Sequence, residues 1–360
     1  MTTKTLIWLV FALVAFGLIM VSSAGIYLSQ KNFGTSYYYF NHQFIFGFLP
    51  GILLFLAASK IDYKIWKKIS LPLIFLSVGL LILVFVPGFG IIGGGAKRWV
   101  NLFGFFSFQP AEILKLVLII YLASLFSSKM HLSKGAVGPA IAFTATLFFM
   151  SIFIAAQPDI GTLGIIVAIA LIMFFASGGA MKHFMAIVLL IVIGFALLTV
   201  FSPYRFSRIF VFLNPDFDVR GAGYHLNQSL IAIGKGGVLG SGFGKGEQKL
   251  GLLPEAVSDS IFAVIGEELG FVGMAAVLIT LLLFVIVSLK IARNTNDKFA
   301  SLYAIGLASW IGVQSFVNIA SLSGLTPLTG IPLPFISYGG TSLAVLMAAA
   351  GILVNVSRKA

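Results

Sequence analysis

The sequence predicts an all-α, polytopic membrane protein, and three observations support this fold class. The chain of 360 residues is 59% hydrophobic and only 9% charged, and its mean hydropathy is +1.07. This composition lies far outside that of a soluble domain. Apolar runs long enough to span about 30 Å of hydrocarbon recur along the chain. One long polar passage, residues 202–260, separates two of these runs.

The apolar runs predict ten transmembrane helices. They cover residues 6–29, 43–59, 70–87, 111–127, 137–156, 160–177, 184–201, 261–289, 299–322 and 339–356. The first run carries no charge and is longer than the apolar core of a secretory signal, so we expect a retained helix rather than a cleaved leader. The predicted architecture is a single integral membrane domain, 1–360, with a long extracytoplasmic loop, 202–260, between helices seven and eight.

The positions of Lys and Arg predict a multi-pass protein of the cytoplasmic membrane with both termini in the cytoplasm. An even number of helices places both termini on one side. The loops and tails of that side contain thirteen Lys or Arg residues, whereas the short loops of the other side contain three. Positive charge concentrates in short cytoplasmic loops. These loops account for the net charge of +12, and we expect no nucleic-acid partner because no basic stripe with interleaved aromatics is present.

Several kinds of chemistry are excluded by composition. The chain has no Cys, so disulfides, thiol catalysis and thiolate metal sites are excluded. Its four His residues form no pair at i, i+4, so a zinc signature is absent. We expect no organic cofactor. The metal that the composition allows is a hard divalent cation, Mg²⁺ or Mn²⁺, held by carboxylates and substrate phosphates.

The acidic residues predict chemistry on the outer side of the membrane. Of eleven, only Asp62 and Asp297 fall on the predicted cytoplasmic side. The passage 201–260 alone holds five acidic and six basic residues. Ionisable groups are costly in hydrocarbon, so their gathering near one surface indicates a water-facing site.

Four charged residues before the long loop are candidates for this site. Glu112 and Lys115 are three apart at the start of a predicted helix and can pair on one face; a local ion pair is the plainer interpretation. Arg98 follows a glycine-rich turn, a pattern typical of a helix-capping loop. Asp159 follows Pro158 before an apolar run, which is ordinary chemistry of a helix N-terminus. Together they would surround one outward-facing depression.

The long loop begins with Arg205 and Arg208 and then contains an apolar segment, 228–233, that predicts a short helix at the interface. The glycine-rich passage 234–246 resembles a phosphate-binding loop only in composition, because the Gly-Lys-Ser/Thr ending is absent. We therefore reject ATP binding. Two interpretations remain for this passage, a site for pyrophosphate and a mobile linker.

Three acidic residues flank the start of the eighth predicted helix. Asp259 precedes the apolar run and is either its N-cap or a reactive carboxylate. Glu267 and Glu268 lie about two turns inside the helix. Adjacent residues point about 100° apart, so at least one of the two should face the bundle interior or a wet cavity.

Four passages carry a resemblance to a known family: 109–112, 157–162, 253–270 and 327–340. In this order the chain resembles the shape, elongation, division and sporulation family, which includes FtsW, RodA and SpoVE. The passages 248–255 and 265–270 resemble the division and sporulation branch, FtsW and SpoVE, more than RodA. The chain departs from the family at 257–260, Val-Ser-Asp-Ser, where the family often has His-Thr-Asp-Phe.

The resemblance implies polymerisation of lipid II into glycan strands by inverting glycosyl transfer at the outer face of the membrane during cell division. It implies Asp259 as the catalytic base. The other residues implied for the substrate site are Arg98, Glu112, Lys115, Asp159, Arg205, Arg208, Lys249, Glu255, Glu267, Glu268 and Ser337. The basic members are candidates to hold the pyrophosphate leaving group, with a divalent ion bridging to carboxylates. The expected partners are a class B penicillin-binding protein, which is a transpeptidase, and other proteins of the division machinery.

Three alternatives remain open: a lipid II flippase or other transporter, an elongation polymerase of the RodA type, and a noncatalytic scaffold. Transporters place ionisable groups and broken helices near the membrane midplane, often in matching positions of two repeats. In this chain the acidic residues crowd the outer side and no internal repeat is visible. The distribution of acidic residues therefore favours the polymerase over the transporter.

Overall fold

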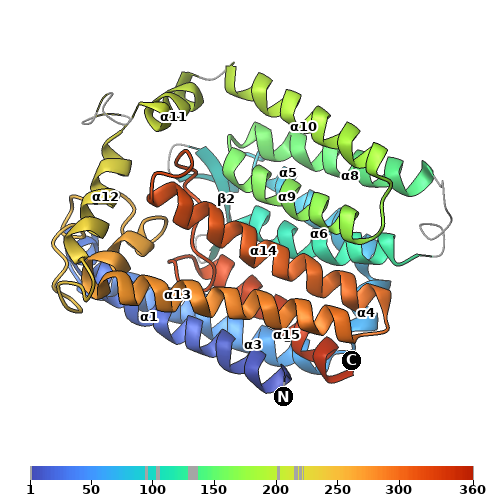
Figure 1. Ribbon diagram of the computed structural model, residues 1–360, viewed down its shortest axis with the longest axis horizontal. Helices are drawn as coiled ribbons and strands as arrows, with labels where there is room; N and C mark the ends of the chain where they lie inside the picture. The colour runs from blue at the N-terminus through green and yellow to red at the C-terminus, as the bar shows by residue number, and fades with distance from the viewer. Residues whose placement is uncertain are drawn as a thin grey trace.

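The computed structural model describes residues 2–93, 96–102, 106–128, 137–200, 203–214, 218, 221 and 223–359. Most of these residues form helices that run along the long axis of the molecule (Figure 1). The helices are α1 (Thr2–Phe33), α2 (Tyr38–Gln43), the π-helix η1 (Phe44–Phe48), α3 (Leu49–Lys60), α4 (Tyr63–Lys68), α5 (Ser70–Leu83), α6 (Pro110–Phe126), α8 (Val137–Ala156), α9 (Ile160–Ala176), α10 (Met181–Val200), α11 (Pro203–Leu213), α12 (Tyr224–Gly236), α13 (Ile261–Asn294), α14 (Lys298–Leu322) and α15 (Gly340–Lys359).

The helices confirm a predominantly helical membrane protein. Each of the predicted apolar runs overlaps a helix. The helical segments long and apolar enough to cross a membrane, by length and composition, are 2–33, 38–60, 261–294, 298–322 and 340–359. Shorter apolar helices cover 70–83, 141–156, 160–176 and 181–194. The number of ten spans and the outer position of 202–260 stay predictions.

A small antiparallel sheet departs from the all-α prediction. Its strands are β1 (Gly90–Gly93), β2 (Ala96–Leu102) and β3 (Phe106–Phe108), in that order. Val100 pairs with Gly90 on one side and with Phe108 on the other. The prediction of a helix-capping loop around Arg98 was therefore wrong. Val100 and Phe108 are buried with Val84 in a second small core, and pairing of the short strands satisfies their backbone groups.

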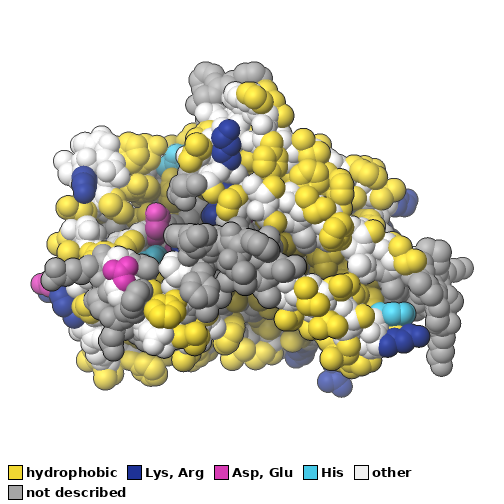
Figure 2. All heavy atoms as spheres, turned by 90° about the horizontal axis from the view of Figure 1, so that it is seen from above, with side chains coloured by type: hydrophobic (Ala, Val, Ile, Leu, Met, Phe, Trp, Pro, Cys, Tyr) yellow, Lys and Arg dark blue, Asp and Glu magenta, His cyan; other side chains and the backbone are white. Residues whose placement is uncertain are grey.

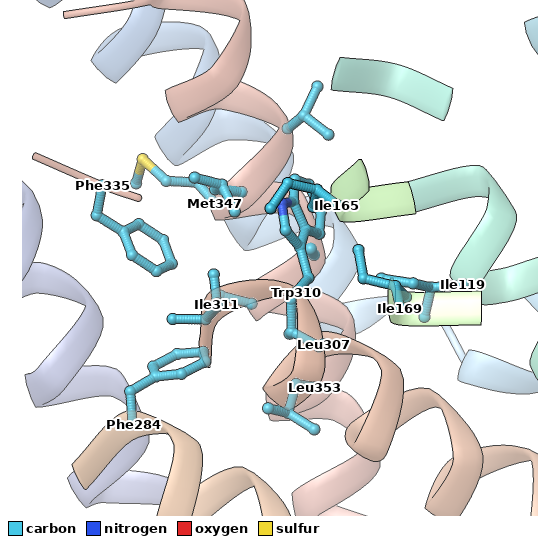
Figure 3. Close-up of a cluster of buried hydrophobic side chains, with 14 of the residues drawn as sticks. Ile119, Ile165, Ile169, Phe284, Leu307, Trp310, Ile311, Phe335, Met347 and Leu353 are labelled. Atoms are coloured by element: carbon cyan, nitrogen blue, oxygen red, sulfur yellow. The ribbon is translucent and has the colours of Figure 1, made fainter. Parts of the chain in front are cut away.

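The centre of the bundle is formed around α14. Trp310 is fully buried there, together with Leu307 and Ile311 of the same helix. Figure 3 shows these side chains among others from α6, α9, α13 and α15. Close-packed apolar contacts of this kind hold helices together in a membrane, where the lipid itself offers no hydrophobic driving force.

The two ends of the described chain lie together. Ser357 Oγ donates to Thr3 Oγ1 over 3.0 Å, and Thr3 Oγ1 lies 3.3 Å from the Ser357 carbonyl oxygen. In Figure 1 both termini lie at the lower right of the bundle, and α12 lies at its left end. The passage 224–260 and the termini are therefore at opposite ends of the molecule.

The acidic side chains visible on one face of the molecule lie toward one of these two ends. Figure 2 shows hydrophobic side chains over most of one face, whereas the acidic side chains visible on that face lie toward its left end, where α12 lies in Figure 1. The predicted short helix at 228–233 is confirmed, since it lies within α12. α11 occupies the basic start of the long loop.

Candidate active site

Asp259 lies at the end of the bundle that carries α12, in a turn that leads into α13. The turn closes on Glu255, whose φ is 49°, a left-handed backbone conformation. The carbonyl oxygen of Glu255 accepts from the amides of Ser258 and Ser260 at 3.1 and 3.0 Å. Ser260 occupies the N-cap position of α13. The alternative of Asp259 as the N-cap was therefore wrong, and its carboxylate accepts no hydrogen bond from the described residues.

The backbone around Asp259 is fixed by neighbouring elements. Asn318 of α14 donates through Nδ2 to the Asp259 carbonyl oxygen over 2.8 Å. Ser337 Oγ donates to the Ser258 carbonyl oxygen over 2.6 Å, and the Tyr338 amide donates to Val257 over 2.9 Å. The main chain is held while the carboxylate has no hydrogen-bond partner in the part of the chain that the structure describes. Such an arrangement suits a group that must contact a substrate.

The electrostatic surroundings of Asp259 bring predicted residues together. Burial, followed by the negative charges of Glu255 and Asp159, raises the pKa of Asp259, the positive charges of Arg208 and Arg98 lower it, and the net result is a pKa of about 7. A carboxyl with a pKa near the operating pH can remove a proton efficiently. Arg98, Asp159, Arg208 and Glu255 thus act on one carboxyl, although they belong to four segments of the chain.

Arg98 and Asp159 connect the sheet to the start of α9. Arg98 Nη2 donates to the Pro158 carbonyl oxygen over 2.7 Å, and its Nε lies 3.9 Å from Asp159 Oδ2. Asp159 caps α9, as predicted from its position, because Oδ1 accepts from the Thr162 amide over 3.2 Å. Gln109 Nε2 lies 3.4 Å from Asp159 Oδ2.

The two predicted arginines of the long loop lie in α11. Arg208 Nη1 donates to the Leu328 carbonyl oxygen over 2.9 Å, so its guanidinium is tied to the proline-rich segment 327–339. The side chain of Arg205 lies outside the described residues. A small hollow opens beside Arg208, lined also by Leu226 and Leu328.

Glu112 and Lys115 form a buried ion pair at 2.7 Å, which confirms the predicted pairing. Lys115 Nζ also donates to Gln314 Oε1 over 2.9 Å and lies 4.9 Å from the centre of the Trp310 ring. Gln314 in turn donates to the Pro332 carbonyl oxygen over 2.8 Å. The pair contacts α14 in the bundle interior and does not join the charges that act on Asp259.

Glu267 and Glu268 both face the interior, so the prediction that at least one would do so is confirmed. Glu267 Oε1 accepts from the amides of Glu247 and Gln248 at 2.8 and 3.1 Å. Glu268 forms an ion pair with Lys249 and accepts from Ser23 of α1 over 2.8 Å. The two glutamates bind the chain that follows α12 to the first turns of α13.

The glycine-rich passage is therefore folded against α13. The amides of Gly244, Glu247 and Gln248 donate to Glu267 or Glu268, so in the structure they do not form an anion cradle. A Cβ at Gly240 would lie 2.2 Å from the Glu268 carbonyl oxygen. The glycines permit this close backbone contact, and the interpretation as a linker was wrong.

Ser337 acts on the position of the Asp259 turn. Its Oγ accepts from the Leu333 amide over 2.8 Å and donates to the Ser258 carbonyl oxygen. The predicted site residues therefore separate into two sets. Arg98, Asp159, Arg208 and Glu255 surround Asp259, whereas Glu112, Lys115, Lys249, Glu267, Glu268 and Ser337 hold the surrounding elements. Their role in binding substrate stays a prediction.

His225 was missed by sequence analysis. It lies in the first turn of α12, and its Nε2 is 2.6 Å from Oγ of Ser260, the residue after Asp259. The sequence offers Val257 and Ser258 before Asp259, so a search among chain neighbours finds no imidazole there. Only the packing of α12 against α13 brings one to this turn.

Among the described residues, no three His, Asp or Glu side chains come together as a ligand set for a metal ion. A resident metal held by protein ligands alone therefore does not fit the part of the chain that is described. Mg²⁺ at phosphate sites is commonly held by one or two carboxylates and the phosphates themselves.

Fold and site together define an integral membrane protein with a carboxyl group of raised pKa at one end of its bundle. The chain belongs to the family of cell cycle proteins FtsW, RodA and SpoVE, whose family model matches residues 4–360. It is 38% identical to the probable peptidoglycan glycosyltransferase FtsW of Trichlorobacter lovleyi, over 98% of this chain and 92% of that protein. It is 37% identical to stage V sporulation protein E of Bacillus subtilis, over 99% of both chains.

Solved structures agree with this assignment. A chain from a peptidoglycan synthase complex, described as coordinating polymerization and crosslinking, matches with a TM-score of 0.78 and 26% identity, over 98% of this chain and 97% of that one. The rod shape determining protein RodA of Thermus thermophilus matches with a TM-score of 0.71 and 25% identity, over 98% and 96% of the two chains.

Proposed function

We propose that this protein is a peptidoglycan glycosyltransferase that polymerises lipid II into glycan strands at the outer face of the cytoplasmic membrane. The observation that carries the proposal is Asp259. Its backbone is fixed by α14 and the segment 327–339, its carboxylate has no partner among the described residues, and its pKa is about 7. A relative named probable peptidoglycan glycosyltransferase FtsW matches over 98% of the chain, which supports the proposal.

The proposed reaction is an inverting glycosyl transfer. Asp259 removes the proton from the GlcNAc 4-hydroxyl of one lipid-linked disaccharide. The hydroxyl oxygen attacks the anomeric carbon of MurNAc on the second, and the bond to undecaprenyl pyrophosphate breaks. Negative charge grows on the pyrophosphate as it leaves, and Arg98 and Arg208, which already act electrostatically on Asp259, are the cations proposed to stabilise it.

A Mg²⁺ or Mn²⁺ ion is proposed only as an ion that binds together with the substrate. The phosphates would supply most of its ligands, and Glu255, an exposed carboxylate beside Asp259, is the protein group at hand. Such an ion would neutralise part of the pyrophosphate charge. No step of the proposed reaction uses it.

The proposed setting is the division machinery, with both termini in the cytoplasm and the 202–260 passage outside. The contact between Thr3 and Ser357 supports termini on one side. FtsW and SpoVE relatives at 37–38% identity support the division and sporulation branch over RodA. The synthase complex among the structural neighbours supports a transpeptidase partner, for which we propose a class B penicillin-binding protein. Further division proteins are proposed as partners on the same basis.

The test is polymerisation of purified lipid II by the protein in vesicles with its transpeptidase, comparing the native sequence with Asp259→Asn. Thermal melting verifies that the variant is folded. Asp62→Asn is a matched control, because Asp62 caps α4 at the end of the bundle near the termini. We expect glycan chains from the native and control proteins and none from Asp259→Asn.

Two results would overturn the proposal. Normal polymerisation by Asp259→Asn would remove Asp259 from the reaction. If no protein polymerises while lipid II crosses the vesicle membrane in the presence of the native sequence, the protein is a transporter.

A further inference from the structure

His225 and Ser260 form an unusual contact beside Asp259. Ser260 is fully buried and stands at the N-cap of α13, where a serine hydroxyl ordinarily accepts from an amide of the first helical turn. Here it makes no such bond. Its Oγ donates instead to the Pro254 carbonyl oxygen over 2.8 Å and lies 2.6 Å from His225 Nε2. The hydroxyl therefore connects α12 to the turn that carries Asp259.

The hydrogen positions of this contact follow from the partners. The Pro254 carbonyl oxygen can only accept, so the single proton of the Ser260 hydroxyl is directed to it. His225 Nε2 must then carry a proton and donate to Ser260 Oγ. Burial and the positive charge of Arg208 lower the pKa of His225, and Glu255 partly opposes them. The ring is thus a neutral donor at neutral pH.

The contact completes the support of the Asp259 turn. α14 and the segment 327–339 hold the carbonyl oxygens of residues 257, 258 and 259 from one side. His225 holds Ser260 from the side of α12. The turn contains Glu255 in a left-handed conformation, which is strained for a residue with a side chain and persists only when its surroundings enforce it. The direction of the Asp259 carboxylate, which has no partner of its own among the described residues, depends on this support.

We propose that His225 is a positioning residue for Asp259, which it holds toward the substrate by donating a hydrogen bond from Nε2 to Ser260. The inference rests on the proposed function. It adds to that function a residue from α12, more than thirty positions away in the chain, that acts through Ser260 and does not contact the reacting atoms.

Variants at His225 and a matched control test the proposal. His225→Gln retains an amide donor of similar reach, whereas His225→Ala leaves the Ser260 hydroxyl without it. His183→Ala is the control, because His183 lies in the separate helix α10. The assay is lipid II polymerisation across a range of pH, with folding verified by thermal melting.

We expect His225→Ala to lower kcat by about tenfold, equivalent to about 1.4 kcal/mol, with little change in KM. On the acidic side of the pH–rate profile, the pH at which kcat reaches half of its maximum, here called the midpoint, should also fall. A loosened Asp259 reaches solvent, so its pKa returns toward its ordinary value. His225→Gln should restore most of kcat and the native midpoint. A purely structural loss would lower the amount of folded protein and leave the midpoint in place.

The inference is overturned if His225→Ala keeps the native kcat and midpoint, or if His225→Gln is as defective as His225→Ala. An inactive native protein would instead overturn the proposed function. Hydrogen exchange of the amides in 255–260 separates these failures, since the positioning contact predicts faster exchange in folded His225→Ala than in the native protein and unchanged exchange in His183→Ala.

Discussion

Replacing Asp259 by Asn should make the protein more stable at alkaline pH while abolishing its reaction. Burial, with Glu255, raises the pKa of Asp259 from 3.8 to about 7. At about 1.4 kcal/mol for each pH unit, the ionised carboxylate in the native state is disfavoured by on the order of 4 kcal/mol. Screening of a half-buried group by solvent reduces this to about 2–4 kcal/mol.

The sign of the pH dependence follows from proton release. Between pH 3.8 and about 7 the unfolded chain has lost the Asp259 proton and the native protein has kept it. The contribution of Asp259 to the free energy of unfolding therefore falls as pH rises through this window and is constant above it. Asn has no proton to lose, so Asp259→Asn should melt above the native protein at about pH 8 and close to it near pH 4.

Thermal melting in nanodiscs at several pH values measures this difference. Asp62→Asn is the control of opposite sign. The ion pair with Lys359 and the Lys64 amide lower the pKa of Asp62, so its ionised form stabilises the native state above pH 4 and its substitution should bring no gain at pH 8. The reasoning is refuted if Asp259→Asn melts below the native protein at pH 8, or if the difference is the same at both pH values.

Three other substitutions test the pH dependence of the rate at acidic pH, the buried Lys249–Glu268 ion pair and the glycine-rich passage. Polymerisation should rise with pH around a midpoint near 7, because the base must be ionised, and Glu255→Gln should lower that midpoint in a pH–rate profile by removing a negative charge from beside Asp259. Lys249→Met leaves Glu268 buried without its cation and should cost about 3–5 kcal/mol in melting experiments, with partial recovery on adding Glu268→Gln. Gly240→Ala should lower Tm, because its φ is 80° and its Cβ would lie 2.2 Å from the Glu268 carbonyl oxygen.

Each of these predictions has a result that contradicts it. A midpoint that rises in Glu255→Gln would reverse the assigned electrostatics. An unchanged Tm in Lys249→Met would show that the Glu268 carboxylate does not need its cation. Gly194→Ala is the control for Gly240→Ala, because nothing lies within 4 Å of a Cβ at Gly194. Equal effects of the two glycine substitutions would refute the close-contact argument.

The features that could be predicted from the sequence are those determined by the free-energy cost of placing nearby residues in lipid or at a helix end. Hydrophobic runs indicate helices in lipid because an unpaired backbone group is too costly there. At least one of Glu267 and Glu268 was predicted to face the interior or a wet cavity because a charge in an apolar helix needs a partner or water. Asp159 was predicted to begin a helix from its immediate sequence. Each inference uses residues within a few positions of one another.

The parts that were not predictable depend on distant partners. Lys249 contacts Ser23, which lies 226 positions away in the chain, and no sequence pattern near either residue predicts the contact. Val100 and Phe108 form strands because Val84 lies against them. The imidazole that contacts Ser260, next to Asp259, comes from α12. Packing brings these groups together, and a single sequence does not record it.

The charged residues of the described chain have two different roles. Lys249 and Glu268 neutralise each other inside the bundle, as do Lys115 and Glu112, and their partners place α1, α6, α13 and α14 relative to one another. Asp259 is held by its backbone alone, at a pKa that makes its own ionisation costly. An ionisable residue at this position does not stabilise the fold, since a neutral residue would remove the free-energy cost of ionising Asp259. A fixed main chain with a destabilising carboxylate that has no partner among the described residues supports the proposed reaction, which needs that carboxylate, and the same proposal accounts for the arginines of two further segments that act upon it.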